Sequence, residues 1–153
     1  MSKGHIHTLE HKHPIWGSRA DSKVIIEDED WQEIIPAKKV KGTSFLYEIC
    51  ALPFFAYDLC LGDTVRTDEK GKVLEAVESA RRFGFRIFIP SQAPHDTSKN
   101  VINELQKHEC HIEYNTSEYF GVDVPNELQA SHISGILQEA GDKGLLKYET
   151  VRT

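Results

Sequence analysis

The hydrophobic pattern of the central segment, residues 45–67, predicts two β-strands joined by an irregular connection. Residues 45–50 alternate between two sets of side chains with the period of two that a half-buried strand requires. Pro53 cannot donate to a strand ladder, so regular pairing must end there. We expect Phe54 and Phe55 to close the end of a small barrel or sheet. The turn dipeptide that begins at Gly62 then leads into a second strand at residues 64–67.

Further short strands with closely spaced turn signals flank this segment. We expect strands at residues 24–26 and 31–40, the second interrupted by a turn at Pro36, and a hairpin turn at residues 68–72. Residues 73–80 fit a strand or a short helix, and the turns that bracket them favour the strand. This pattern predicts a small antiparallel β-barrel-like lobe.

The second half of the chain alternates between strand and helix patterns. Strands are expected at residues 85–89, 111–114, 119–124 and 145–151, and helices at residues 99–109 and 125–141. Asp96 is an N-cap candidate for the first helix, and Leu128, Ile133 and Leu137 belong to the expected inner face of the second. The order β-α-β-β-α-β is that of a ferredoxin-like unit.

Together these patterns predict an α+β fold in three parts. Residues 1–23 form a polar, His-rich N-terminal segment, residues 24–82 a small β-barrel-like lobe, and residues 83–153 a ferredoxin-like lobe. A chain of 153 residues is long enough to bury a core in one compact domain or in two small lobes.

Composition and charge limit the classes of protein to which this chain can belong. A net charge of −6 argues against a nucleic-acid binder, which needs a basic surface. No apolar run approaches the roughly 18 residues of a membrane span, and no secretory signal is visible at the N-terminus. We therefore expect a cytoplasmic protein without a membrane partner. The three cysteines, Cys50, Cys60 and Cys110, are expected to be reduced core residues.

Four consecutive acidic residues form the candidate partner-binding site: Glu27, Asp28, Glu29 and Asp30. Because like charges repel, this run belongs on the surface, and most such runs are simply solvated loops. In a functional interpretation, the run provides an electrostatic contact for a basic protein partner and speeds its association.

Several histidines raise the question of a metal site. His5, His7, His11 and His13 lie within nine positions. A metal-binding tract is one interpretation. A partly ordered terminus that happens to be rich in histidine is the favoured one, because terminal residues are commonly loose, and no carboxylate or cysteine is placed to complete a closed site. For His108 and His111, a solvated helix end is likewise favoured over a metal site. We predict no metal and no cofactor.

Residues 81–88 interleave three arginines with three aromatic residues, as some RNA-binding strands do. The order of glycine and aromatic residues differs from that motif. We therefore expect Phe85 and Ile87 to face the core and Arg82 and Arg86 to be solvated. His95 next to Asp96 suggests an acid–base pair, but adjacent side chains usually point apart and Asp96 is wanted as a cap. With no nucleophile elbow and no phosphate-binding loop, the sequence predicts no enzyme activity.

Two short motifs carry a family resemblance. Pro-Phe-Phe-Ala at residues 53–56, followed by Leu-Gly-Asp-Thr-Val at residues 61–65, resembles the core of the bacterial family called domain of unknown function 4265. The resemblance covers about residues 31–150. It implies a stand-alone bacterial cytoplasmic protein, and it carries over no catalytic residue.

From these observations we expect a non-enzymatic protein-binding module. Small size, acidic charge and the run at residues 27–30 favour an immunity-type inhibitor that binds and neutralises a cognate bacterial toxin. The alternative is a small-ligand-sensing regulatory domain that acts as a dimer, because ferredoxin-like units often pair through their sheets and bind ligands at the interface.

Overall fold

The computed structural model describes residues 6–151 and contains two β-sheets and two α-helices. The first half holds β1 (His7–Glu10), a short 3-10 helix η1 (Gly17–Arg19), β2 (Ser22–Glu27), β3 (Trp31–Lys39), β4 (Leu46–Ile49), β5 (Thr64–Thr67) and β6 (Val73–Glu78). The second half holds β7 (Phe83–Phe88), α1 (Thr97–Leu105), β8 (His111–Tyr114), β9 (Tyr119–Val124), α2 (Glu127–Asp142) and β10 (Lys147–Thr150).

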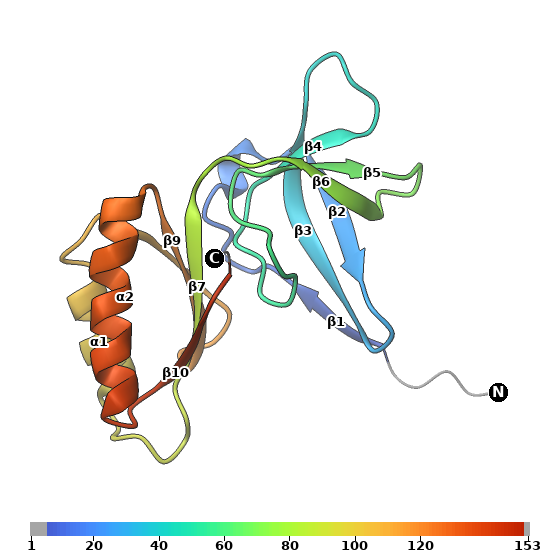
Figure 1. Cartoon of the computed structure of the whole chain (residues 1–153). Coiled ribbons are helices and arrows are strands. Elements are labelled where there is room, and N and C mark those ends of the chain that lie inside the picture. Colours follow the sequence, from blue (N-terminus) through green and yellow to red (C-terminus); the bar gives the residue numbers. More distant parts are fainter. Residues whose placement is uncertain (1–5, 152–153) are drawn as a thin grey trace.

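The predicted α+β class is confirmed, and the elements form stacked layers. The N-terminal sheet has the order β1-β3-β4-β5-β6, with β2 also paired to β3, and the C-terminal sheet has the order β10-β7-β9-β8. Helices α1 and α2 cover one face of the C-terminal sheet, and the N-terminal sheet lies on the other side of it (Figure 1). Each sheet therefore has its own apolar core cluster.

The N-terminal sheet is curled but does not close into a barrel. Strands β2 to β6 pair antiparallel with their neighbours, whereas β1 runs parallel to β3. A single bridge joins Ile25 in β2 to Lys72, the residue before β6, and the Ile25 amide donates to the carbonyl of Gly71 at 2.8 Å. The expected strand at residues 73–80 is confirmed as β6, which is exposed along most of its length.

The predicted turn at Pro36 is wrong, because β3 runs through this proline without a break. The Pro36 carbonyl accepts a hydrogen bond from Cys50 N at 2.9 Å, which places the proline nitrogen on the same edge of β3. On that edge β1 pairs only as far as Ile34, and β4 begins pairing at Ala37. The missing N–H thus falls between two partner strands, where the ladder does not need it.

In the C-terminal half, β7, α1, β8, β9, α2 and β10 follow one another as the pattern predicts. Helix α1 ends at Leu105, earlier than expected, while Asn126 caps α2 by accepting from Gln129 N at 2.9 Å. Leu128 is 64% exposed, so its predicted inward position is wrong. It lies five residues before the buried Ile133, about 140° around a helix that turns 100° per residue. No helix among residues 6–151 has the length and apolar character to cross a bilayer.

The connection between β4 and β5, residues 50–63, joins the two sheets, and we call it the crossing connection. It leaves the N-terminal sheet and places Leu52 against Gly84 in β7 and Gly121 in β9. A Cβ at either glycine would collide with the Leu52 side chain. Glycine, which has no side chain, therefore lets the connection pass close to both strands. Phe54 is buried, as predicted, and Phe55 is partly buried with its ring edge-on to Trp31 at 5.4 Å between centroids.

Candidate functional site

The four predicted partner-binding residues are exposed: Glu27 ends β2, and residues 28–30 form the turn to β3, on the side of the molecule away from the helices (Figure 1). The Asp28 amide donates to the Trp31 carbonyl at 2.9 Å, and the Glu29 amide donates to Asp28 Oδ1 at 2.7 Å, so the turn has a defined backbone. Glu27 forms an ion pair with Lys72 at 2.7 Å, and this pair raises the pKa of the lysine. We call residues 27–30 the acidic turn.

The β5–β6 turn, residues 68–72, approaches β2 and carries two acidic residues and two lysines. The β5–β6 turn begins at Asp68, whose Oδ1 accepts hydrogen bonds from the amides of Lys70 and Lys72, both at 2.9 Å. The hydrogen bond from Lys72, and then that from Lys70, lower the pKa of the Asp68 carboxyl, so it is ionised at neutral pH. The Ile25 amide of β2 donates to the Gly71 carbonyl at 2.8 Å, so this turn is joined to β2.

The interior of the protein holds a cluster of three polar side chains that the sequence did not predict. His11 Nε2 lies 2.6 Å from a carboxylate oxygen of Glu33 in β3, and His11 Nδ1 forms a short hydrogen bond with Glu113 in β8. The three side chains are fully buried. The imidazole also stacks on the ring of Phe54, with 4.9 Å between centroids. We call Glu33, His11 and Glu113 the buried triad.

Both carboxylates also accept backbone N–H groups from the crossing connection. Glu33 accepts from Phe54 N at 2.7 Å, from Phe55 N at 3.0 Å and from Ala56 N at 3.3 Å. Glu113 accepts from Leu52 N at 3.0 Å, and from Ile15 N, in the N-terminal segment, at 3.1 Å. The triad therefore fixes a loop that has no regular secondary structure of its own.

The geometry suits a charged histidine. Each ring nitrogen faces a glutamate side chain, and a doubly protonated imidazolium donates to both of them. Burial by itself would lower the pKa of His11, but the hydrogen bonds and charges of Glu113 and Glu33 outweigh it and raise the pKa to about 9. The backbone N–H groups that surround the triad satisfy the remaining acceptor sites of its two glutamates.

This arrangement has a structural role. No solvent-exposed atom of the triad side chains is available to a substrate, and each imidazole nitrogen is already occupied by its own carboxylate. Within residues 6–151, no group of three or more histidine, cysteine, aspartate or glutamate residues has the geometry to hold a metal ion. The favoured interpretation of the N-terminal histidines as a loose terminus is wrong at His11, while His5 lies outside the described residues.

The histidines considered as metal ligands near the end of α1, His108 and His111, do not point to a common site. His108 lies next to His132, with 5.0 Å between ring centroids, whereas His111 lies 3.3 Å from Asp123. His95 and Asp96 are both exposed, and Asp96 occupies the N-cap position of α1 without a side-chain cap hydrogen bond. These positions give no acid–base pair.

The arginines of residues 81–88 have different environments from the predicted ones. Phe85 and Ile87 face the core as expected. Arg82 forms a bidentate contact with the buried Asp123, at 3.0 Å from Nε and 2.6 Å from Nη2, and the pair raises the pKa of the arginine. The expectation that Arg86 is solvated is wrong, because its side chain is 2% exposed and Nη1 donates to the Ala56 carbonyl at 2.7 Å. The crossing connection covers this part of the sheet.

The three cysteines are free, as predicted, and Cys50 and Cys60 are buried. Cys110 is partly buried, and its sulfur lies 3.3 Å from the Leu105 carbonyl. Burial raises the pKa of the Cys50 thiol to about 11. A thiol with this pKa is protonated at neutral pH and is a poor nucleophile.

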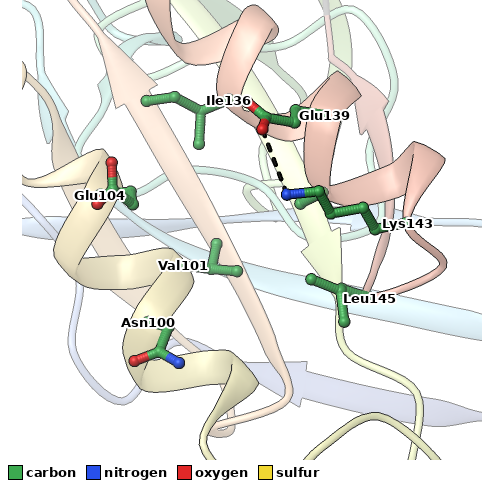
Figure 2. Close-up of a pocket in the computed structure, with 8 residues that line it drawn as sticks. Asn100, Val101, Glu104, Ile136, Glu139, Lys143 and Leu145 are labelled. Carbon is green, nitrogen blue, oxygen red and sulfur yellow. Dashed lines mark hydrogen bonds and ion pairs between the residues drawn. The ribbon is translucent and has the colours of Figure 1, made fainter.

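A surface groove lies between the two helices (Figure 2). It has a volume of about 290 Å³, and Val101 of α1 and Ile136 of α2 form part of its apolar wall. Its rim is polar, with Glu139 and Lys143 joined by an ion pair at 3.3 Å. The groove has no concentration of one charge and no buried polar group directed into it among the residues that line it.

Comparison with known proteins places the fold but assigns no activity. A family model described as Domain of unknown function (DUF4265) matches residues 33–148. A comparison with curated proteins gives no match. Among solved structures, the chain is similar to one described as a hypothetical protein from Neisseria gonorrhoeae, with a TM-score of 0.70 and 22% identity over 86% of this chain and 94% of that one. At this identity the similarity concerns the fold alone.

Proposed function

We propose that this chain, which belongs to the family described as Domain of unknown function (DUF4265), is a non-enzymatic protein-binding module. In its specific form, the proposal is an immunity-type inhibitor that binds and neutralises a cognate toxin in the bacterial cytoplasm. The observation that carries the proposal is the acidic turn, in which four consecutive carboxylates are exposed on a hairpin with a defined backbone.

The chemistry of a basic partner fits this surface. A toxin that acts on nucleic acid must present cations to phosphate groups, and a carboxylate-rich hairpin competes for the same cations. The hydrogen bonds within the turn reduce the conformational entropy that binding would otherwise cost. The β5–β6 turn adds no net charge, because Lys70 and Lys72 balance its two acidic residues, and Lys72 partly neutralises Glu27. We therefore expect Asp28, Glu29 and Asp30 to contribute more than Glu27.

The absence of enzyme activity is also a proposal, and the buried triad supports it. A carboxylate–histidine–carboxylate group is a familiar catalytic combination, but here every side chain of the group is enclosed. Its oxygens accept backbone N–H groups of the crossing connection instead. This use of the triad favours an anchor for the loop rather than an acid–base group.

The finer description of the fold belongs to the same proposal. We describe residues 83–153 as a ferredoxin-like lobe, which is supported by the strand order β10-β7-β9-β8 with both helices on one face. We describe residues 24–82 as a barrel-like lobe, which is supported by the bridge between β2 and β6. Residues 1–23 are the third part, and β1 and His11 connect it to both lobes.

Co-expression tests the proposed function. The gene next to this one in the native genome is expressed in a test host with the wild-type chain or with a variant that neutralises the acidic turn, E27Q/D28N/E29Q/D30N. We expect the neighbouring gene to be toxic alone, the wild type to restore growth and the variant to restore it poorly. The matched control, E104Q/E109Q/E118Q/E139Q, removes the same charge from exposed positions on the other lobe and should protect like the wild type.

A second candidate function is a small-ligand-sensing regulatory domain that acts as a dimer. The groove between α1 and α2 favours it, because a concave surface with apolar walls can hold a small molecule (Figure 2). The sheet face through which ferredoxin-like units commonly pair is partly covered here by the crossing connection. Stabilisation of the wild type by members of a metabolite panel would favour this candidate, and a flat response would count against it.

A further inference from the structure

The face of the C-terminal sheet opposite the helices is only partly covered by the crossing connection. Strand register places its side chains in rows, and two of these rows are Gly121–Arg86–Glu149 and Tyr119–Phe88–Lys147. Leu52 covers the first row at Gly121, and the ring of Phe54 lies 5.5 Å from that of Tyr119. Toward β10 the face is open and forms a groove of about 180 Å³, lined by Arg86, Phe88, Tyr119, Lys147, Tyr148 and Glu149. We call it the Arg86 groove.

Arg86 is the unusual residue of this groove. Its side chain is 2% exposed, and Nη1 is satisfied by the Ala56 carbonyl. Nε lies 2.7 Å from an oxygen of Glu149, but no acceptor among residues 6–151, Glu149 included, has hydrogen-bond geometry to it. Nearly all buried polar groups in proteins have a hydrogen-bond partner, so a buried donor without a well-aligned acceptor is unusual.

Glu149 is a partner that can leave. Its side chain is 51% exposed, at the end of the row that Arg86 occupies on the neighbouring strand. A half-exposed carboxylate keeps much of its hydration, and its attraction to a cation is worth little when it is freely solvated. Rotation of Glu149 into solvent would open the direction of the Arg86 Nε–H group to another acceptor.

The rest of the groove combines a second cation with apolar surface. Lys147 is exposed and pairs across the strands with Phe88, which is 48% exposed on the same face. The Tyr119 hydroxyl donates to the Phe54 carbonyl at 2.6 Å, so its ring is held in place as a wall. Two cations face one carboxylate, which makes the groove locally positive in a chain of net charge −6.

We propose that the Arg86 groove binds a small organic anion. A planar guanidinium suits the oxygens of a carboxylate or phosphate, Lys147 supplies the second positive charge, and Phe88 receives an apolar or aromatic body. The groove is smaller than the 300–1,000 Å³ or so of pockets for drug-sized ligands, so the ligand has about the size of one ring. This site lies on the other lobe from the acidic turn and does not depend on the proposed inhibitor function.

An NMR titration of the full chain tests the proposal with three probes. Benzoate carries a carboxylate on a ring, benzamide is its neutral counterpart, and inorganic phosphate is the anion without a ring. We expect benzoate to shift the amide signals of residues 86–88 and 147–149 in a saturable way, and benzamide to leave them unchanged. Shifts with phosphate as strong as with benzoate would assign the site to oxyanions generally. Equal shifts with benzamide, or no saturable shifts with either anion, would overturn the proposal.

Exposed variants are used for this test, because R86Q removes a buried group and would confound a loss of binding with a loss of stability. E149Q removes the competing carboxylate and should tighten benzoate binding about threefold, whereas K147Q should weaken it about threefold. K107Q, an exposed lysine of the region after α1, is the matched control and should bind benzoate as the wild type does. If E149Q and K147Q both bind benzoate with the wild-type affinity, the assignment is wrong.

Discussion

His11 and Glu113 are 102 residues apart in the sequence, and their side chains form a fully buried hydrogen bond between the N-terminal segment and β8. The other nitrogen of the same imidazole lies 2.6 Å from Glu33 in the N-terminal sheet. One side chain thus links three separate parts of the chain. The stability of the junction between the two sheets should therefore depend on His11 to an extent unusual for a residue so near a terminus.

Replacing His11 should be strongly destabilising. H11A leaves two buried carboxylates without their cation, and breaking a buried charge pair typically costs about 3–5 kcal/mol of unfolding free energy. Urea denaturation measures this difference. H13A, at an exposed position two residues away, is the control and should change the unfolding free energy by less than about 0.5 kcal/mol. Similar effects of the two substitutions would contradict the role assigned to His11.

The same residue predicts how stability depends on pH. The pKa of His11 is about 9 in the folded protein against 6.5 in the unfolded chain, so the folded state binds the proton more tightly. Its contribution, on the order of 3 kcal/mol, is fully present below pH 6.5 and is lost as the pH rises through 9. Urea denaturation from neutral to alkaline pH should show this loss in the wild type. The H11A variant should lack it, and parallel curves for the two proteins would rule the explanation out.

The close contact of Leu52 with the glycines of β7 and β9 can be tested by alanine substitutions. G121A places a methyl group against the Leu52 side chain and should cost about 1–3 kcal/mol, as overpacking usually does. Gly135, in α2, has open space around its Cβ position, so G135A should be neutral or stabilising by up to about 1 kcal/mol. The double variant L52A/G121A should be more stable than the sum of the single effects predicts, because the two residues touch. Simple additivity would argue against the contact.

The paired phenylalanines of the crossing connection should differ. F54A removes a buried ring that contacts His11 and Tyr119, and should cost about 3–5 kcal/mol. F55A removes a partly buried ring and should cost clearly less. Thermal unfolding of both variants checks this order. Loss of binding activity in F54A would then report unfolding, so this residue is unsuitable for mapping the partner surface.

Much of the fold could be predicted because its elements have local causes. The alternation at residues 45–50, the hairpin at Asp68 and the cap at Asn126 each act through neighbours in the sequence. The error at Pro36 has a physical reason, since an extended proline is tolerated where a partner strand happens to end. Whether it does is decided by tertiary structure.

The buried triad could not be predicted in the same way. Its members are brought together by the packing of two sheets, and none of the three has a local motif. One signal was available: Glu33 and Ile35 lie on the same side of β3, and a glutamate in phase with core residues needs a buried partner. The sequence did not show that this partner is a histidine from the polar N-terminal segment. The same holds for Arg86, which is buried because residues from another part of the chain cross over it.

The proposed binding role of the acidic turn is tested most directly by the affinity of the chain for its captured partner. The wild type is used to capture a basic protein from the native host, and calorimetry then compares its affinity for the wild type, E27Q/D28N/E29Q/D30N and the matched control E104Q/E109Q/E118Q/E139Q. We predict at least about a tenfold loss for the acidic-turn variant alone, and wild-type binding that weakens as salt is raised from about 50 to 200 mM. Equal affinities of all three proteins, insensitivity to salt, or capture of no basic partner would contradict the account.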